Sequence, residues 1–232
     1  MKIAVMQPYL FPYIGYFQLM NAVDKFVIYD DVNFINRGWI NRNSILVNGE
    51  ANLFTIPLKK ASQNKLINQI EISDSFDWKE KLLSTLTHNY KKATNFKKVF
   101  NLISEIINID ESNISKLIYK SLLSINEYLN VNTTIIETSS VYQNSELKKE
   151  ERIIDICKKE NSEHYINPVG GIVLYSKESF QSQGIDLNFL QPRKIKYKQF
   201  NEIFINSLSI IDVLMFNSNP EVKEFLKDYE LL

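Results

Sequence analysis

The sequence predicts an α/β fold with a mainly parallel sheet. Short apolar, β-branched runs alternate with segments whose apolar residues recur every three or four positions. A strand, a helix and a second strand fit within the first thirty residues, which is typical of a βαβ unit with a right-handed crossover. A long helical stretch then interrupts the alternation at about residues 75–130. We therefore expect one domain over residues 1–232, with a helical insertion at that place.

The first seventy residues are predicted to contain short strands and turns. The opening strand, helix and strand form a Rossmann-like unit, and Asn48-Gly49 is typical of a type I′ hairpin turn. The expected elements are strand Lys2–Met6, helix Ile14–Ala22, strands Lys25–Tyr29, Ser44–Val47 and Ala51–Ile56, and strand Gln69–Ile72.

The rest of the chain is predicted to be helical first and then alternating. Three amphipathic helices make up the insertion, and a proline opens the last helix of the chain, where its missing N–H is harmless. The expected elements are helices 75–90, 95–107 and 113–129, strand 133–138, helix 146–159, strand 164–166, helix 175–183, strand 186–190, and helices 207–216 and 220–229.

Composition excludes several classes of protein. The formal net charge is zero, so a protein that coats DNA is not expected, because phosphate binding needs excess positive charge. No apolar run approaches the roughly 20 residues of a membrane span, and no secretory h-region is present. The only cysteine, Cys157, is expected to be a buried thiol in a helix. We expect a cytoplasmic protein; its oligomeric state stays open.

Three unusual segments follow predicted strands: the aromatic turn after Met6, Asp30-Asp31, and the loop 167–171. In open parallel sheets, ligands bind beyond the carboxyl ends of the strands. We therefore expect Gln7, Tyr13, Asp30, Arg42 and Asn167 to surround one cleft.

The aromatic turn offers groups for binding and for stacking. Gln7 can hydrogen-bond a base, sugar or amide edge, while Tyr9 and Tyr13 each offer a hydroxyl and a ring. Gly15 allows close approach of backbone at the start of a helix, where anions bind. The alternative is an aromatic plug that covers the edge of the sheet.

Carboxylates and a histidine are the candidate bases. Asp30 and Asp31 are candidates for a general base or for contacts to ribose hydroxyls or Mg²⁺, but adjacent strand residues face opposite sides, so only one is expected to face the site. His88, at a helix end, is the third candidate base. The alternative for the two aspartates is a solvated acid pair in a turn.

Further candidate binding residues lie in three other segments. The guanidinium groups of arginine can bind phosphates, and tryptophan can stack on a base or sugar ring. Side-chain amides can hydrogen-bond to hydroxyls, and a glycine pair offers backbone N–H groups to an oxyanion. A carboxylate inside an apolar helix needs a partner, for which an arginine such as Arg37 or a ligand amine would serve, unless the helix is exposed. These residues are Asn33, Arg37, Trp39, Asn41, Arg42, Asn167, Gly170, Gly171 and Asp212.

Several common signatures are missing from the sequence. It contains no HExxH, CxxC or paired-histidine spacing, so no structural zinc or other metal site is expected. It also contains no GxGxxG, no P-loop and no GxSxG elbow.

Four segments resemble the WbqC-like protein family, and the resemblance covers nearly the whole chain. They are the stretch MQPYLFPYIGYFQLMNAVDKFVIYDDVNFINRGWINRN (residues 6–43), FTIPL (54–58), YINPVGG (165–171) and LSIIDVLMFN (208–217). The family takes its name from a gene of bacterial O-antigen clusters. The resemblance therefore implies cytoplasmic work on lipopolysaccharide precursors, on a nucleotide-linked amino sugar.

A second likeness concerns only the turn Tyr13-Ile14-Gly15-Tyr16. It is similar to the His-x-Gly-His turn of nucleotidylyltransferases, which holds ATP phosphates at a helix start. Tyrosine replaces both histidines here, so the turn supplies no positive charge, and Arg37, Arg42 or a metal would have to compensate.

The resemblance and the residues together predict an amide-forming N-acyltransferase. It would transfer an acyl or aminoacyl group, such as glycyl, to the amine of a nucleotide-linked deoxyamino sugar. The donor stays open between an ATP-activated acid, an acyl-CoA and an aminoacyl-tRNA. The alternatives are a non-catalytic nucleotide-sugar binding or scaffold protein and an ATP-dependent nucleotidyl or adenylyl transferase.

Overall fold

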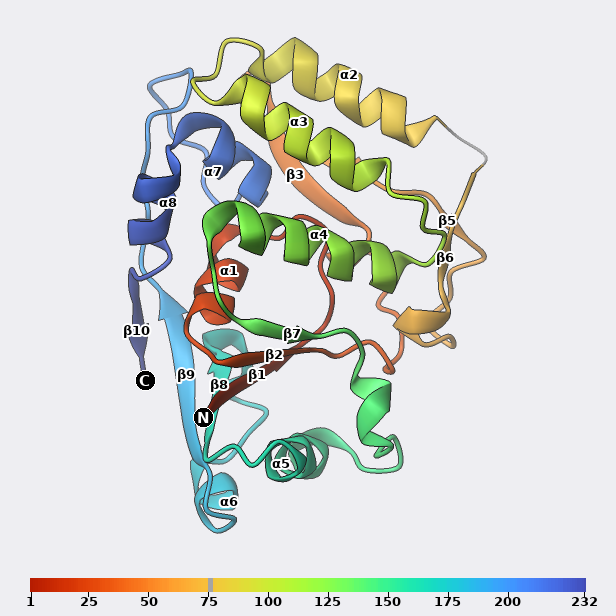
Figure 1. Cartoon of the computed structure of the whole chain (residues 1–232), viewed down its shortest axis with the longest axis vertical. Helices are drawn as coiled ribbons and strands as arrows, with labels where there is room; N and C mark the ends of the chain where they lie inside the picture. Colours follow the sequence, from red (N-terminus) through yellow and green to blue (C-terminus); the bar gives the residue numbers. More distant parts are fainter. Residues whose placement is uncertain (75–76) are drawn as a thin grey trace.

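A six-stranded sheet organises the computed structural model, which describes residues 1–74 and 77–232 (Figure 1). Five strands run parallel, and β10 pairs antiparallel with β9. The mainly parallel α/β fold predicted from the sequence is therefore confirmed. The strands are β1 (Lys2–Met6), β2 (Lys25–Ile28), β7 (Thr134–Ile136), β8 (His164–Pro168), β9 (Asp186–Pro192) and β10 (Tyr229–Leu231).

The strand order is β7-β2-β1-β8-β9-β10. Numbered by their appearance in this sheet, the strands lie in the order third, second, first, fourth, fifth, sixth, which is that of a doubly wound sheet. Strand order reverses between β1 and β8. In such sheets ligands bind beyond the carboxyl ends of the strands at this point, so the turn after β1 and the loop after β8 are the segments at which a site is expected.

Helices cover both faces of the sheet, because alternate strand residues point to opposite sides (Figure 1). Ala4, Phe26 and Ile28 belong to the larger core, whereas Ile3 and Val27 belong to the smaller one. The larger core includes α1 (Ile14–Asn21), α4 (Ile114–Leu129), α7 (Ile210–Phe216) and α8 (Asn219–Phe225); the smaller includes α5 (Lys149–Lys159) and α6 (Lys177–Gln181).

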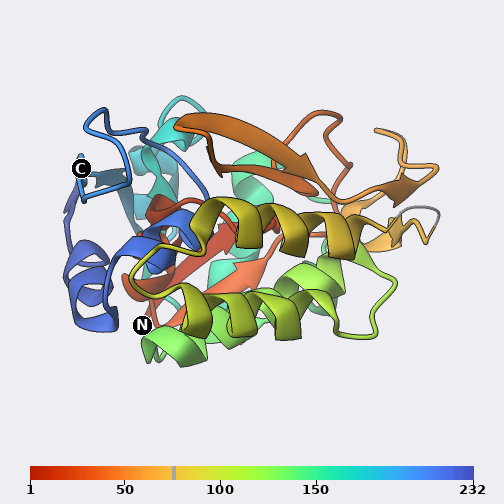
Figure 2. The ribbon, with the colours of Figure 1, turned by 90° about the horizontal axis from the view of Figure 1, so that it is seen from above.

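The helical insertion lies between β2 and β7, as expected from the spacing of its apolar residues. α2 (Trp78–Tyr90), α3 (Phe96–Ile107) and α4 lie side by side (Figure 2). The predicted start of α2 at residues 75–76 lies outside the described residues. Two antiparallel pairs precede these helices: β3 (Arg42–Val47) with β4 (Glu50–Thr55), and β5 (Leu58–Lys59) with β6 (Glu71–Ile72).

The β3–β4 turn has the predicted chemistry. Asn48 has φ 52° and Gly49 has φ 84°, and positive φ at both central residues is what a type I′ turn requires.

The C-terminal segment differs from the prediction. The helix expected over 220–229 ends at Phe225, and Tyr229 begins β10. Phe189 and Leu232 exchange two backbone hydrogen bonds of 2.9 and 3.0 Å, which complete the β9–β10 edge. A three-residue strand is too short to show an alternating pattern, so the sequence could not indicate it.

Three other helices are more than one residue shorter than predicted, and one of them is the helix expected over 207–216, which begins at Ile210. The helix expected over 146–159 begins at Lys149, and the helix expected over 175–183 covers Lys177–Gln181. Ser176 caps the latter by accepting a hydrogen bond from the Ser179 N–H. Tyr175 lies before this cap and instead packs against Tyr165, with ring centroids 6.0 Å apart.

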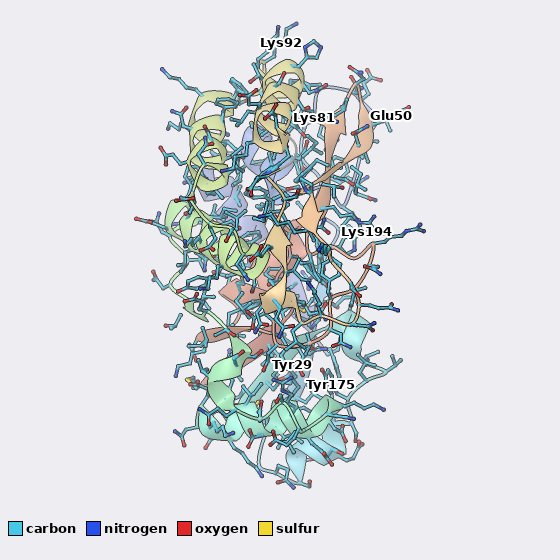
Figure 3. The ribbon with its side chains drawn as sticks, turned by 90° about the vertical axis from the view of Figure 1, so that its right-hand side faces the viewer. Tyr29, Glu50, Lys81, Lys92, Tyr175 and Lys194 are labelled. Atoms are coloured by element: carbon cyan, nitrogen blue, oxygen red, sulfur yellow. The ribbon has the colours of Figure 1, made fainter. Side chains whose placement is uncertain are left out.

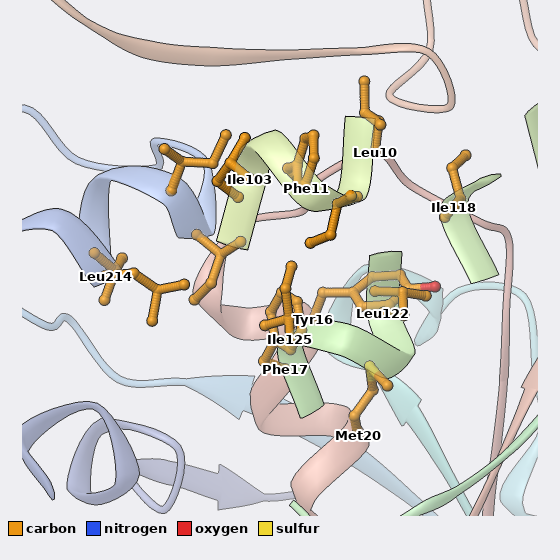
Figure 4. Packing of buried hydrophobic residues seen from close by; sticks show 14 of the residues in the cluster. Leu10, Phe11, Tyr16, Phe17, Met20, Ile103, Ile118, Leu122, Ile125 and Leu214 are labelled. Carbon is orange, nitrogen blue, oxygen red and sulfur yellow. The ribbon is translucent and has the colours of Figure 1, made fainter. Parts of the chain in front are cut away.

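The larger core holds much of the turn after β1 (Figure 4). Leu10 and Phe11 belong to the same core cluster as residues of α1, α3 and α4, Ile103 and Ile118 among them. The turn is therefore anchored by burial of its own apolar side chains. Among the described residues, no helix has the length and apolar character needed to cross a bilayer.

Candidate functional site

The turn after β1 is held in one conformation by distant polar groups. The Asn43 side-chain amide donates to the carbonyl oxygens of Leu10 and Phe11, at 3.0 and 2.9 Å. The Ser209 hydroxyl also donates to the Phe11 carbonyl, at 2.7 Å. Phe11 has φ 41°, a left-handed conformation unusual for a bulky residue. These contacts fix a backbone that would otherwise be strained.

The aromatic side chains of the turn divide between core and surface. Phe11, Tyr16 and Phe17 are buried in the larger core (Figure 4). Tyr9 is half-buried, and Tyr13 is 40% exposed. The plug interpretation therefore describes the buried residues, while Tyr9 and Tyr13 are available to a ligand.

Tyr9 and Tyr13 line a cavity of about 370 Å³, which is within the range of small-molecule sites. Trp39, 47% exposed, forms another wall, and the Arg42 guanidinium lies 5.9 Å from the Trp39 ring centroid. Three aromatic rings around one cavity are suited to stacking on a planar or sugar ring. Pro12, Asn43 and Ser207 complete the lining.

A second cavity of about 480 Å³ adjoins the first, because Tyr13 and Ser207 line both. Its walls include Arg193, Lys194 and Lys196, and none of the described residues that line it is acidic. We call the two cavities together the Tyr13 groove. This basic wall was not among the predicted site residues, although the run PRKIKYK (residues 192–198) is a visible signal for it.

Gly15 is required by the position of the Tyr13 ring. A Cβ built on Gly15 would lie 2.3 Å from Cε2 of Tyr13, so the ring lies over the first turn of α1. That turn has no acidic residue and no side-chain cap. Its N–H groups therefore favour a negatively charged group nearby.

Burial raises the pKa of Tyr9 and of Tyr13 above the ordinary value of 10.0, and the neighbouring phenol adds to the rise at Tyr9. Both phenols are neutral at physiological pH. Their hydroxyls are therefore available as hydrogen-bond donors to a ligand.

Asp30 faces the insertion. It is 2% exposed, and its carboxylate accepts hydrogen bonds from Ser115 at 2.8 Å and Thr138 at 2.6 Å. Burial raises the pKa of Asp30, these hydrogen bonds oppose that rise, and the Asp31 charge adds to it. A raised pKa suits a base, but the carboxylate already has protein partners.

Asp31 lies beyond the end of β2 and contacts α5, on the other side of the sheet from the α4 partner of Asp30. Its Oδ2 lies 2.5 Å from Nη2 of Arg152, a buried ion pair, and Ser139 donates to its Oδ1. Arg152 also donates to Asn144 at 3.0 Å and lies 4.9 Å from the Tyr29 ring centroid. Arg152 was not a predicted site residue, because its partner is 121 residues away in the sequence and no local pattern links the two.

His88 is not near the two aspartates. It lies in the last turn of α2 and lines a hollow that also contains Phe200 and Asn201. Figure 3 shows Lys92, just beyond α2, at one end of the molecule, while Tyr29, adjacent to Asp30, lies toward the other. The structure therefore does not assemble the three candidate bases into one site.

The residues between 33 and 42 have different environments. Asn33 and Arg37 are exposed, and Arg37 has φ 60°. The Asn41 side chain donates to the Ile56 carbonyl at 2.7 Å, and Arg42 Nε donates to the Gly38 carbonyl at 2.9 Å. Asn41 and Arg42 therefore both have structural partners, and Trp39 is the predicted residue of this segment that lines the Tyr13 groove.

The loop after β8 is built around a buried amide. Asn167 accepts a hydrogen bond from the Tyr165 hydroxyl at 3.0 Å, and a Cβ on Gly171 would lie 1.9 Å from its Nδ2. Gly170 is exposed. The two cavities of the Tyr13 groove include neither Asp30 nor Asn167, so the single cleft predicted around Tyr13, Asp30 and Asn167 is not found there. Gln7 is half-buried between β1 and the turn, and its carbonyl accepts from the Tyr16 hydroxyl at 3.0 Å.

Asp212 is fully buried, and its expected partners were wrong. Neither an arginine nor an exposed surface accommodates it: the hydroxyls of Tyr90 and Tyr197 donate to it at 2.7 and 2.6 Å, and the Gln199 amide at 2.8 Å. Neutral donors therefore satisfy this carboxylate. Through them Asp212 of α7 is hydrogen-bonded to α2 and to the segment that contains Tyr197 and Gln199.

In the ranges 1–74 and 77–232, no group of three or more His, Cys, Asp and Glu is placed to hold a metal ion. Asp30 and Asp31 point to opposite faces, so they do not form a carboxylate pair for a cation.

Comparison with known proteins agrees with the motifs in the sequence. The model of the WbqC-like protein family matches residues 7–224. The chain is 28% identical over 229 residues to the uncharacterized protein Rv1507c of Mycobacterium tuberculosis. This match covers 97% of each of the two chains. No solved structure matches the chain significantly. The match spans both walls of the Tyr13 groove, and the chain belongs to the WbqC-like protein family.

Proposed function

We propose that the protein binds a nucleotide-linked deoxyamino sugar in the Tyr13 groove and transfers an acyl or aminoacyl group to its amine. The observation that carries the binding part is the aromatic cavity of about 370 Å³ formed by Tyr9, Tyr13 and Trp39. Tyr9 and Tyr13 belong to the turn after β1, and strand order reverses between β1 and β8. Turns at the carboxyl ends of such strands are where doubly wound sheets bind nucleotides, which supports a nucleotide-linked ligand.

The proposed reaction forms one amide bond. The neutral amine of the sugar attacks the acyl carbonyl carbon, the C–N bond forms, and the bond to the donor's leaving group breaks. The proton of the amine passes to the leaving group or to water. Resemblance to a family named after an O-antigen gene supports the choice of an amino sugar as acceptor. An ATP-activated acid, an acyl-CoA and an aminoacyl-tRNA are the donors to test.

A second candidate is a non-catalytic nucleotide-sugar binding protein. The buried environments of Asp30 and Asp31 favour it, because both carboxylates already have protein hydrogen-bond donors. The position of His88 outside the Tyr13 groove also favours it. In this case the groove binds the ligand and no product forms.

A ligand panel tests both candidates on the purified chain. UDP- and dTDP-linked 4-amino sugars are compared with the same nucleotide sugars lacking the amine, each alone and with ATP and Mg²⁺, acetyl-CoA or glycyl-tRNA. A ligand at a hundredfold over its Kd stabilises the native state by about 2.7 kcal/mol, which raises Tm by about 5–11 °C for a chain of this size. Mass spectrometry of the sugar detects the added acyl group.

The outcomes separate the candidates. A stabilising amino sugar that gains an acyl mass supports the transferase, while stabilisation without product under any donor supports the binding protein. Tyr13→Ala removes a groove wall and is expected to abolish the shift. Lys92→Ala, at the far end of the molecule (Figure 3), is the matched control and is expected to preserve it. If no nucleotide sugar shifts Tm, or if Tyr13→Ala leaves the shift intact, the proposal is wrong.

A further inference from the structure

The segment Arg193–Ser207 forms one wall of the Tyr13 groove without regular secondary structure. We call it the strap. Arg193 donates its N–H to the Asp228 carbonyl at 3.1 Å. Over 194–207, no backbone-to-backbone hydrogen bond joins the strap to another described residue. Side chains must therefore hold the strap in place.

Asp212 contributes to that hold, together with packing of the Tyr197 ring on Phe225 and of the Phe200 ring on Phe216, at centroid distances of 6.4 and 4.8 Å. The hydroxyl of Tyr197 and the amide of Gln199 both donate to Asp212 Oδ2, at 2.6 and 2.8 Å. Gln199 also closes the strap on itself, because its side chain donates to the Ile205 carbonyl and accepts from the Ile205 N–H, at 3.0 and 2.8 Å. One buried carboxylate thus fixes the middle of the strap to α7, and Tyr90 fixes that carboxylate to α2 at 2.7 Å.

The strap places the ammonium-bearing residues Lys194 and Lys196, which have no salt-bridge partner among the described residues, in the lining of the groove. Arg193 lies near Glu230 at 3.1 Å and Asp228 at 3.7 Å, so its charge is largely compensated. In contrast, Lys194 and Lys196 line the cavity of about 480 Å³ and have no carboxylate within 4.0 Å in the described part of the chain. Lys194 extends outward in Figure 3.

The charge of this cavity contrasts with that of the whole protein. The formal net charge of the chain is zero, yet the lining of this cavity contains three cationic side chains. The adjoining cavity is aromatic and contains no charged lining residue. A ligand that fills both cavities therefore needs a ring system at one end and a negatively charged group at the other.

We propose that Lys194 and Lys196 bind the diphosphate of a nucleotide-linked ligand, and that Asp212 is the positioning residue that holds them there through Tyr197 and Gln199. This inference rests on the proposed function for the identity of the ring-bearing part. Lysine ammonium groups bind phosphate as compact charges. Their position depends on the strap, and the position of the strap depends on Asp212.

The test measures binding of UDP and dTDP, and of the nucleosides uridine and thymidine, by calorimetry on the full chain. Lys194→Gln with Lys196→Gln is expected to weaken diphosphate binding by at least about tenfold, the loss of one charge-assisted hydrogen bond. Nucleoside binding should stay within about twofold, because the aromatic cavity is unchanged. Lys91→Gln with Lys92→Gln removes the same charge from another exposed site and should change neither affinity.

The positioning role has its own variants. Asp212→Asn and Tyr197→Phe are expected to weaken diphosphate binding while nucleoside binding stays. Combined with the lysine substitutions they should add little further loss, because both changes remove the same interaction. Tyr197→Phe removes one hydroxyl and keeps the ring, so it carries this test if Asp212→Asn does not fold.

Each result either supports or overturns the inference. Unchanged diphosphate affinity in the double lysine variant, equal loss of nucleoside affinity, or no diphosphate binding by the wild type would overturn it. Losses of diphosphate affinity that simply add for the Tyr197 and lysine variants would overturn the positioning role. If diphosphate binding depends on the lysines but no acyl transfer occurs, the transferase proposal is wrong and the diphosphate site stands. If acyl transfer occurs at the same rate without both lysines, the diphosphate site is wrong and the transferase proposal stands.

Discussion

Replacing Arg152 with methionine removes one partner of the buried ion pair with Asp31. The two side chains are 4% and 7% exposed. Methionine fills much of the volume but leaves the Asp31 carboxylate with Ser139 as its remaining side-chain donor. The substitution also removes the hydrogen bond that Arg152 Nε donates to Asn144 Oδ1. The substitution therefore creates an uncompensated charge inside the protein.

The expected magnitude follows from that burial. Removing one partner of a buried pair destabilises a protein by about 3–5 kcal/mol. For a chain of this size each kcal/mol lowers Tm by about 2–4 °C, so we expect Tm to fall by about 6–20 °C. The double variant Asp31→Asn with Arg152→Met removes both charges and should be more stable than the single variant.

Urea unfolding followed by circular dichroism measures these differences. Lys227→Met is the matched control, because Lys227 and Glu224 form a pair at 2.8 Å whose side chains are 64% and 72% exposed. Such a pair contributes less than about 1 kcal/mol. If Arg152→Met costs no more than Lys227→Met, the pair is not buried and the reasoning is refuted.

Three further predictions concern other groups. Gly15→Ala should displace the Tyr13 ring and weaken ligand binding in the groove while changing stability by less than about 1 kcal/mol, since the end of a flexible side chain yields; a large loss of stability in urea would contradict this. Cys157 is buried with a pKa raised to about 12 by desolvation, so its thiol should react with a disulfide reagent only after unfolding in urea, and rapid labelling of the native protein would show that it is accessible. Burial raises the pKa of Asp212 above its ordinary value of 3.8, so the native state binds this proton more tightly than the unfolded state does. The stability of the wild type relative to Asp212→Asn should therefore fall as pH rises from about 4 through the raised pKa, and a difference that grows over this range in urea titrations would show that the shift has the opposite sign.

The predictable parts of the fold are those that local sequence determines. The amphipathic spacing of α4 and the Asn48-Gly49 turn depend on neighbouring residues, and both were predicted correctly. The order of strands was not predictable, because pairing of β1 with β8 joins residues more than 160 positions apart. β10 was missed because three residues carry no period.

The candidate site shows the same division. Asp30 and Asp31 were expected to face opposite sides as residues of a strand; β2 ends at Ile28, and the two carboxylates instead reach different helices, α4 and α5, from the loop that follows. Their partners, Ser115 and Arg152, come from helices that no local pattern links to β2. The prediction of a single cleft around Tyr13 and Asp30 was wrong for this reason. Both residues follow neighbouring strands, but contacts with distant segments determine the direction in which each side chain points.

The Ser209 hydroxyl that fixes the Phe11 carbonyl lies 198 residues further along the chain. Contacts of such high sequence separation form late in folding, because closing a long loop must precede them. The rings of the turn pair with nearby residues such as Tyr16 and Phe26, but we expect the Phe11 backbone to gain its Ser209 partner only after residues near α7 have left the ribosome. The Tyr13 groove combines residues near both ends of the chain, so it forms only when the C-terminal segment packs against the turn after β1. Ligand binding therefore reports completed folding of the whole chain.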